Sequence, residues 1–311
     1  MNKKLNSLLI SLITLFILSQ FFINSELLIN TFFNSINLFI YNLFPNIFVF
    51  FIITDILNNY NFSYYLEKIL GNIFSKIYKL PKNASYIIFM SLFSGFPSNS
   101  KLIKEGLDNK KINTFDATKL LTMTHFSNPL FIIYSVGINF FHDKKIGIII
   151  FISHFITNFI IGFLFRNIYK INENNYQNTF INPKSFMETI KTSINNTFMI
   201  SFNILGIIIF FSILTTIINN YLDLNPFSNT ILNGILEITN GLKLLSNLSL
   251  DKIKAATLAT FFISFGGLSI HMQIMSILSK YKLNYLIYFI SRIMHAGISS
   301  IISLIILINI Y

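Results

Sequence analysis

Long apolar runs alternate with short polar interruptions along almost the whole chain, which predicts an all-α polytopic membrane protein. A helix needs about 20 largely apolar residues to cross a bilayer. Four runs approach this length: Leu8–Ile23, Ile146–Phe165, Met199–Ile218 and Ile287–Ile308. A fifth run, Phe48–Leu57, is shorter and is expected to enter the membrane through a kink. Tyr64–Tyr78 and Phe186–Asn196 are amphipathic, and the first of them predicts a helix at the membrane interface.

Polar residues together with Gly or Pro interrupt the apolar segments at corresponding places in the two halves of the chain. The first half carries SGFPSNSK at 94–101 and HFSNP at 125–129. The second half carries EITNG at 237–241 and SFGGLSIHMQ at 264–273. Broken apolar segments in matching positions are typical of the midplane substrate site of a transporter. Backbone that leaves the helix inside a bilayer needs protein or a water-filled cavity to receive its hydrogen bonds.

The interruptions predict two re-entrant hairpins and two broken helices. The first hairpin has its tip at Gly95-Phe96-Pro97, and Ser98, Asn99 and Ser100 are expected to cap the helix that follows. The second hairpin spans 231–245 with its tip at 239–241. The helix of 117–134 is expected to break at 127–129, and that of 255–265 to end at Gly266.

The two halves predict one transmembrane domain, residues 1–311, that is built from two repeats. We expect a first repeat at 40–166, a hydrophilic connector at 167–184 and a second repeat at 185–311. Asn99 falls near Asn240 in the alignment of the halves, and Ser127 falls near Gly266. Such weak internal symmetry is expected of transporter repeats.

Composition supports the membrane assignment and excludes several classes of function. The 311 residues are 53% hydrophobic and only 11% charged, whereas soluble domains carry about 25% charged residues. The net charge of +11 comes mostly from Lys between apolar runs, which favours anionic lipid headgroups over nucleic acid. The absence of Cys removes disulfides and thiolate chemistry. The five His are scattered, and no catalytic constellation stands out, so we expect neither a metal, a cofactor nor an enzyme.

In this order and spacing, four motifs resemble the nucleoside-recognition (Gate) domain family. They are residues 95–101, 126–131, 234–241 and 265–273, and the resemblance runs from about residue 40 to the C-terminus. It implies a fold similar to concentrative nucleoside transporters, with two inverted repeats that each hold a re-entrant hairpin and a broken helix. The family usually has Gly-Ala where this chain has Asn99 and Ser100. Asn tolerates left-handed backbone better than most residues, so the turn can survive.

The resemblance also implies a function. Sporulation members of the family are implicated in moving dipicolinic acid across the outer forespore membrane, so the chain is expected in the cell membrane and, in sporulating cells, in that membrane. Dipicolinate is a flat aromatic dianion that needs donors, positive potential and an apolar slot. Half-helix N-termini supply the first two, Lys101 would add a full charge, and Phe96 and Phe265 would flank the ring.

The candidate substrate site draws on all four motifs. Its residues are Pro97, Ser98, Asn99, Ser100, Lys101, Ser127, Asn128, Pro129, Glu237, Asn240, Gly266, Gly267, Ser269 and Gln273.

Each of these residues also has a purely structural interpretation. Lys101 would then be a snorkelling side chain at a hairpin end, the two prolines would be packing kinks, and the glycine pair would mark a close helix crossing. Glu237 would bind a coupling ion or proton, or form a salt bridge to Lys243 or Arg292. His271 and His295 would relay protons or be hydrogen-bonded packing residues.

Three functions follow. The first is a transporter or facilitator of a small anion, dipicolinate above all. The second is a nucleoside transporter of the same fold, in which Glu237 and Asn240 read ribose hydroxyls. The third is a structural sporulation membrane protein that moves no solute. The expected partners are the small-molecule substrate and the lipid bilayer, with a homo-oligomer by analogy.

Overall fold

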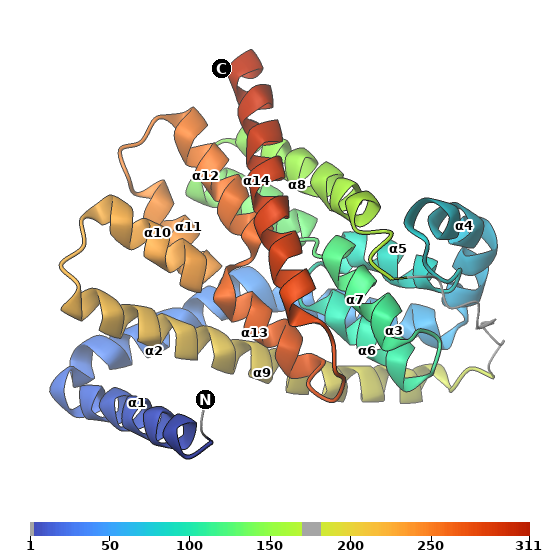
Figure 1. The fold of residues 1–311 in the computed structure, drawn as a ribbon, viewed down its shortest axis with the longest axis horizontal. Coiled ribbons are helices and arrows are strands. Elements are labelled where there is room, and N and C mark those ends of the chain that lie inside the picture. Colours follow the sequence, from blue (N-terminus) through green and yellow to red (C-terminus); the bar gives the residue numbers. More distant parts are fainter. Residues whose placement is uncertain (1–2, 170–181) are drawn as a thin grey trace.

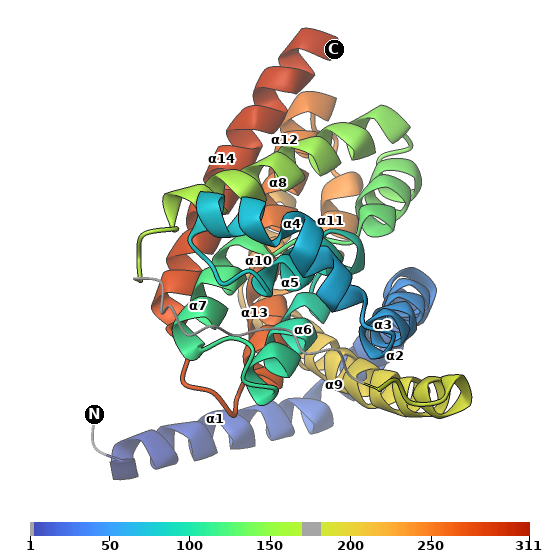
Figure 2. The same ribbon diagram turned by 90° about the vertical axis from the view of Figure 1, so that its right-hand side faces the viewer.

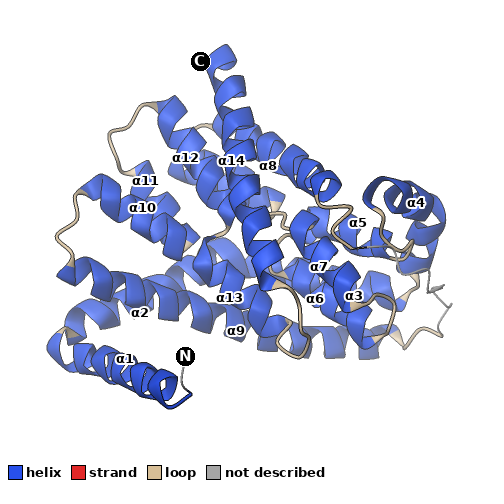
Figure 3. Cartoon of the chain, viewed as in Figure 1, coloured by secondary structure: helices blue, strands red, loops and turns tan. Residues whose placement is uncertain are grey.

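The computed structural model describes residues 3–169 and 182–311, and every regular element in them is a helix (Figure 3). The central part of the predicted connector, residues 170–181, lies outside the described residues. The elements of the first half are α1 (Lys3–Ile23), α2 (Ser25–Leu38), η1 (Phe39–Leu43), α3 (Phe44–Asn59), α4 (Phe62–Tyr78), α5 (Ala84–Ser94), α6 (Ser98–Asp108), α7 (Thr114–Met123), η2 (Phe131–Phe140) and α8 (Lys144–Leu164). Those of the second half are α9 (Phe186–Tyr221), α10 (Pro226–Leu236), α11 (Ile238–Ser246), α12 (Lys252–Phe265), α13 (Gly267–Ile277) and α14 (Tyr285–Ile310).

Five helices in the described part of the chain are long and apolar enough to cross a membrane. They are 4–23 in α1, the helices α8, α9 and α14, and the nearly continuous pair α12–α13. The protein is therefore an integral membrane protein. α1 lies along one edge of the molecule with little of its surface covered by the rest of the chain (Figures 1 and 2).

The predicted interruptions are real breaks, with two shifts of position. Gly95, Phe96 and Pro97 separate α5 from α6 as predicted, with a cis peptide bond before Pro97. Gly266 separates α12 from α13, also as predicted. The break after α7 begins earlier, at Thr124, and the second hairpin breaks at Glu237 rather than at 239–241.

Two other expectations about local structure are wrong. Pro97 itself is the N-cap of α6, with no side-chain capping bond, so Ser98, Asn99 and Ser100 lie inside the first turn and do not cap it. Ser100 Oγ instead donates to Pro97 O at 2.6 Å. The amphipathic segment 186–196 and the span 199–218 form one continuous helix, the 36-residue α9, because neither Pro nor Gly separates them.

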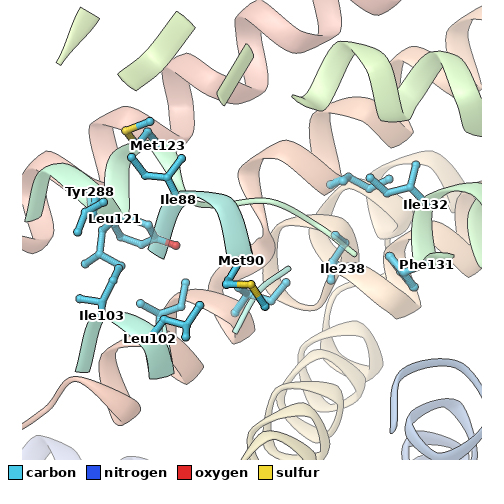
Figure 4. Packing of buried hydrophobic residues seen from close by; sticks show 14 of the residues in the cluster. Ile88, Met90, Leu102, Ile103, Leu121, Met123, Phe131, Ile132, Ile238 and Tyr288 are labelled. Atoms are coloured by element: carbon cyan, nitrogen blue, oxygen red, sulfur yellow. The ribbon is translucent and has the colours of Figure 1, made fainter. Parts of the chain in front are cut away.

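The main buried core surrounds the breaks and joins the two halves. Figure 4 shows Ile103 of α6, Ile132 of η2, Ile238 of α11 and Tyr288 of α14 among its members. Lipid tails are as apolar as these side chains, so burial from water does not hold such a core together; close packing and interhelical hydrogen bonds do. The core thus fixes the relative positions of the breaks, where polar groups gather.

Candidate functional site

Four helix breaks from distant parts of the chain meet in the interior. We call them the first break (Gly95–Pro97), the second break (Thr124–Asn128), the third break (Glu237) and the fourth break (Gly266). The first and second breaks are joined by a hydrogen bond from the Phe96 N–H to Phe126 O, at 2.7 Å. The four breaks form one site if the third and fourth breaks also contact the first two or each other.

Close backbone approaches make the remaining connections. A Cβ on Gly266 would lie 2.5 Å from His125 Nε2, which brings the fourth break against the second. A Cβ on Gly267 would lie 3.3 Å from Ile238 N, which brings the fourth break against the third. Gly266 has φ +87° and Gly267 has φ +61°, values that L side chains rarely adopt. Glycine at this pair therefore permits both the turn and the contacts.

A cavity lies where the breaks meet. Its lining residues come from the first three breaks and from η1, α3, α5, η2, α9, α11 and α13: Leu43, Ile47, Ser94, Phe96, Pro97, Ser127, Asn128, Phe131, Ile204, Ile208, Glu237, Ile238, Thr239, Ile270 and Gln273. The volume open to the centre of a water-sized sphere is about 40 Å³. That is room for about three water molecules, whereas pockets for organic ligands measure about 300 to 1,000 Å³. In this conformation the cavity is too small to hold an organic solute.

Helix N-termini converge on the cavity. α6 begins directly after Pro97, α11 after Glu237 and α13 after Gly266, and η2 begins three residues after Asn128. The first N–H groups of a helix have no partner within the helix, and the helix dipole adds about half a positive charge there. Part of this donor capacity is already used: the Asn240 N–H donates to Glu237 Oε2, and the Asn99 and Ser100 N–H groups donate to Gly95 O and Pro97 O.

Among the described residues Glu237 is the one ionisable residue that lines the cavity, and it is 1% exposed. Its Oε2 accepts a hydrogen bond from the Asn240 N–H at 2.8 Å and so caps α11. No ion pair joins it to Lys243 or Arg292, all three of which are described. The salt-bridge interpretation is therefore wrong. What remains is a buried carboxyl group held by backbone donors at the wall of a cavity.

Several predicted polar residues hold atoms that have no partner. Ser127 Oγ at the cavity and Ser98 Oγ, Asn99 Oδ1 and Ser269 Oγ near the breaks are buried and unbonded among the described residues. The Gln273 side chain lines the cavity at 4% exposure and makes no hydrogen bond to a described residue. Buried polar groups nearly always find partners, so these atoms are suited to receive water or a ligand.

Lys101 does not face the cavity. Its ammonium group pairs with Asp55 of α3 and lies 3.9 Å from Glu105, one turn along α6. The residue is 7% exposed, so it is not a snorkelling side chain at a water-facing hairpin end. Its charge is used to hold α6 against α3.

The structure thus divides the predicted site. Pro97, Ser127, Asn128, Glu237 and Gln273 line the cavity. The others do not line it: Ser98, Asn99, Ser100, Lys101, Pro129, Asn240, Gly266, Gly267 and Ser269. Among these, Asn240 donates from Nδ2 to Ser212 Oγ at 2.9 Å and so ties α11 to α9.

Buried side chains bond to the backbone at the breaks and at the helix ends beside them, and sequence reasoning missed two of these side chains, His154 and Asn158. Asn158 of α8 donates to His125 O at 3.1 Å, and His154 of α8 accepts from the Ser127 N–H at 2.9 Å. His271 Nε2 lies 3.0 Å from Phe265 O, and Arg292 of α14 donates to Thr122 O. Polar residues in an apolar span were the available signal, and the middle of α8 carries four of them, at 153, 154, 157 and 158.

The contacts of His271 and His295 favour packing over a proton relay. His271 Nδ1 lies 3.1 Å from Tyr285 Oη, and His295 Nε2 lies 3.0 Å from His154 O. Each ring therefore spans two fixed partners. In the described residues no group of three or more His, Cys, Asp and Glu could hold a metal ion.

Comparison with known proteins places the first two breaks in a known domain. Residues 40–144 match the family model of Gate, described as nucleoside recognition. This part of the chain is therefore similar to the nucleoside-recognition Gate domain. The match covers the first and second breaks, and the third and fourth breaks lie beyond it.

A second similarity covers most of the chain. The chain is 23% identical over 332 aligned positions to the sporulation integral membrane protein YlbJ of Bacillus subtilis (strain 168), covering 94% of this chain and 80% of that protein. No solved structure matches.

Proposed function

We propose that this protein is a transporter or facilitator that moves a small organic solute across its membrane through the central cavity. The observation that carries the proposal is that three helix breaks line one cavity inside an apolar bundle and that a fourth packs against two of them. Non-helical backbone at membrane depth is tolerated only where protein or a water-filled cavity receives its hydrogen bonds. Here the cavity lies directly at three of the breaks, which supports a role for it beyond packing.

We further propose that the protein is built from two inverted repeats, like the concentrative nucleoside transporters that its motifs resemble. The order of element lengths supports this. α5, α6, α7, η2 and α8 have 11, 11, 10, 10 and 21 residues. α10 to α14 have 11, 9, 14, 11 and 26 residues. Movement of one repeat against the other would open the closed cavity to each side in turn.

The first substrate candidate is dipicolinate, in the outer forespore membrane of a sporulating cell. The name of the relative supports the setting, since that protein is a sporulation integral membrane protein. The helix N-termini, the free Ser127 hydroxyl and the Gln273 amide supply donors for two carboxylates, and Phe96 and Phe131 supply aromatic walls. No lysine or arginine lines the cavity, so the dianion would bind with Glu237 protonated.

The second candidate is a nucleoside, and one specific observation favours it. In the part of the chain that the structure describes, the only ionisable group at the cavity is acidic, and a carboxylate accepts hydrogen bonds from ribose hydroxyls. The description of the matching family, nucleoside recognition, agrees with this assignment. A homo-oligomer remains part of the proposal by analogy with nucleoside transporters.

Uptake of labelled dipicolinate and, in parallel, labelled uridine into proteoliposomes tests the proposal. Wild type is compared with Gln273→Leu, which removes the free amide, and with Met272→Leu, an exchange at an exposed neighbour on the same helix. Saturable flux that falls in Gln273→Leu and persists in Met272→Leu supports the cavity as the path. The solute that is transported decides between the two candidates. No flux of either solute favours a structural role.

A further inference from the structure

A single buried histidine connects two helix breaks that come from opposite halves of the chain. His154 lies in the middle of α8 and is 0% exposed. The backbone N–H of Ser127, in the second break, lies 2.9 Å from its Nε2. Its Nδ1 lies 2.9 Å from Oγ of Ser264, in the last turn of α12 before the fourth break. One imidazole ring therefore spans both sites.

The geometry assigns the tautomer. A backbone N–H can only donate, so Nε2 must be the unprotonated nitrogen that accepts from Ser127. Nδ1 then carries the proton and donates to Ser264 Oγ. Both ring nitrogens are in use, and a ring that was turned over would place its carbon atoms against Ser127 and Ser264 and lose both hydrogen bonds. The ring is thereby fixed in one orientation between the two breaks.

The contact acts on a residue of the cavity. Ser127 lines the cavity and its Oγ has no partner. The peptide of Ser127 belongs to a segment without helical hydrogen bonds, so its direction is set by neighbours. Asn158, one turn further along α8, holds the same segment through His125 O at 3.1 Å. α8 thus supplies a donor and an acceptor to the second break, and only His154 extends this link to Ser264.

We infer that His154 is a positioning residue: it fixes the direction in which Ser127 faces the cavity and couples the second break to the fourth. The inference rests on the proposed function only in so far as the cavity binds the transported solute. Losing one buried hydrogen bond that orients a binding group is expected to raise KM about three- to tenfold. Vmax changes less, because the bundle itself remains intact.

The test compares three variants of α8 in the proteoliposome assay. His154→Phe keeps a ring and removes both bonds, and His154→Gln keeps an amide oxygen that can accept from the Ser127 N–H. Thr157→Val is the matched control, because its hydroxyl bonds only to Ser153 O of the same helix, at 2.7 Å. The expected order of KM is His154→Phe above His154→Gln above Thr157→Val and wild type. Equal KM in His154→Phe and Thr157→Val overturns the inference.

A second readout needs no substrate. The chain has no Cys, so Ser127→Cys introduces a unique thiol whose reaction rate with a small thiol reagent reports its direction and access. The labelling rate of the double variant Ser127→Cys with His154→Phe is expected to differ at least threefold from that of Ser127→Cys alone. Adding Thr157→Val to Ser127→Cys should leave the labelling rate unchanged. If wild type transports neither solute, the proposed function fails, and the labelling rate alone decides whether His154 positions Ser127.

Discussion

Gly95 is the position where adding one methyl group tests the contact between the first and second breaks. Its backbone has φ +68° and ψ −174°, a region that is essentially restricted to glycine. A Cβ placed there would lie 2.5 Å from Asn128 N and 3.0 Å from Ser127 C. Both atoms are backbone, so neither can rotate away as a flexible side chain would. Gly95→Ala therefore combines conformational strain with a clash.

The two costs set the size of the effect. A non-glycine residue in this region costs about 1 to 3 kcal/mol, and overpacking of a tight contact costs about 1 to 3 kcal/mol. Together they predict a loss of about 2 to 6 kcal/mol in the free energy of unfolding. Gly206→Ala is the control, because Gly206 lies in α9 with nothing within 4 Å of its Cβ position. There we expect a gain of about 0.5 to 1 kcal/mol from helix propensity.

The assay is unfolding of the purified protein in detergent micelles by added denaturing detergent, followed by circular dichroism. Solute uptake is measured on the same preparations. Gly95→Ala should unfold well before wild type, and Gly206→Ala should not. If the two alanine variants unfold alike, the two breaks do not touch as described, and the cavity loses one of its walls.

Three further predictions concern other contacts. Lys101→Ala leaves the Asp55 carboxylate, which is 16% exposed, without its cation and should cost about 2 to 4 kcal/mol in unfolding free energy. Lys101→Met with Asp55→Leu should recover most of that loss; equal stability of the single and double variants would contradict this. Glu237→Leu removes the cap of α11 and should cost about 1 kcal/mol, whereas Glu237→Gln should keep it, as unfolding curves can show. The Tyr311 hydroxyl donates to Asp143 at 2.6 Å and lowers the pKa of that carboxyl, so the contact stabilises above about pH 4 and is lost as pH falls through the lowered pKa. Tyr311→Phe should therefore unfold more easily than wild type at pH 7, and the difference should vanish in strongly acidic solution.

Apolar length and local breakers were enough to predict most of the fold. The span ending at Phe165 and the break at Gly266 appear within a few residues of their predicted places, because run length and glycine are local signals. The break at Glu237 was misplaced by two residues, since Asn240 and Gly241 look like turn residues although they lie inside α11. Tertiary packing of the hairpin arms overrides the turn propensity of Asn240 and Gly241.

The site was harder to predict than the fold. Motifs identified the right segments, and Ser127, Glu237 and Gln273 do meet at the cavity. Sequence could not tell that Lys101 faces Asp55, because the partner lies 46 positions away on another helix. Nor could it reveal His154, whose role depends on two contacts at separations of 27 and 110 residues. Long-range contacts of this kind leave no local pattern.

The most direct test of the central claim, that the cavity at the helix breaks binds the solute, is substrate protection of a single thiol. Ser127→Cys places it at the cavity, and Ser279→Cys places the control at an exposed turn between α13 and α14. Dipicolinate or uridine should slow labelling of Ser127→Cys in a saturable manner and leave Ser279→Cys unaffected. If neither solute protects Ser127→Cys at concentrations that saturate uptake, the cavity is not where the solute binds.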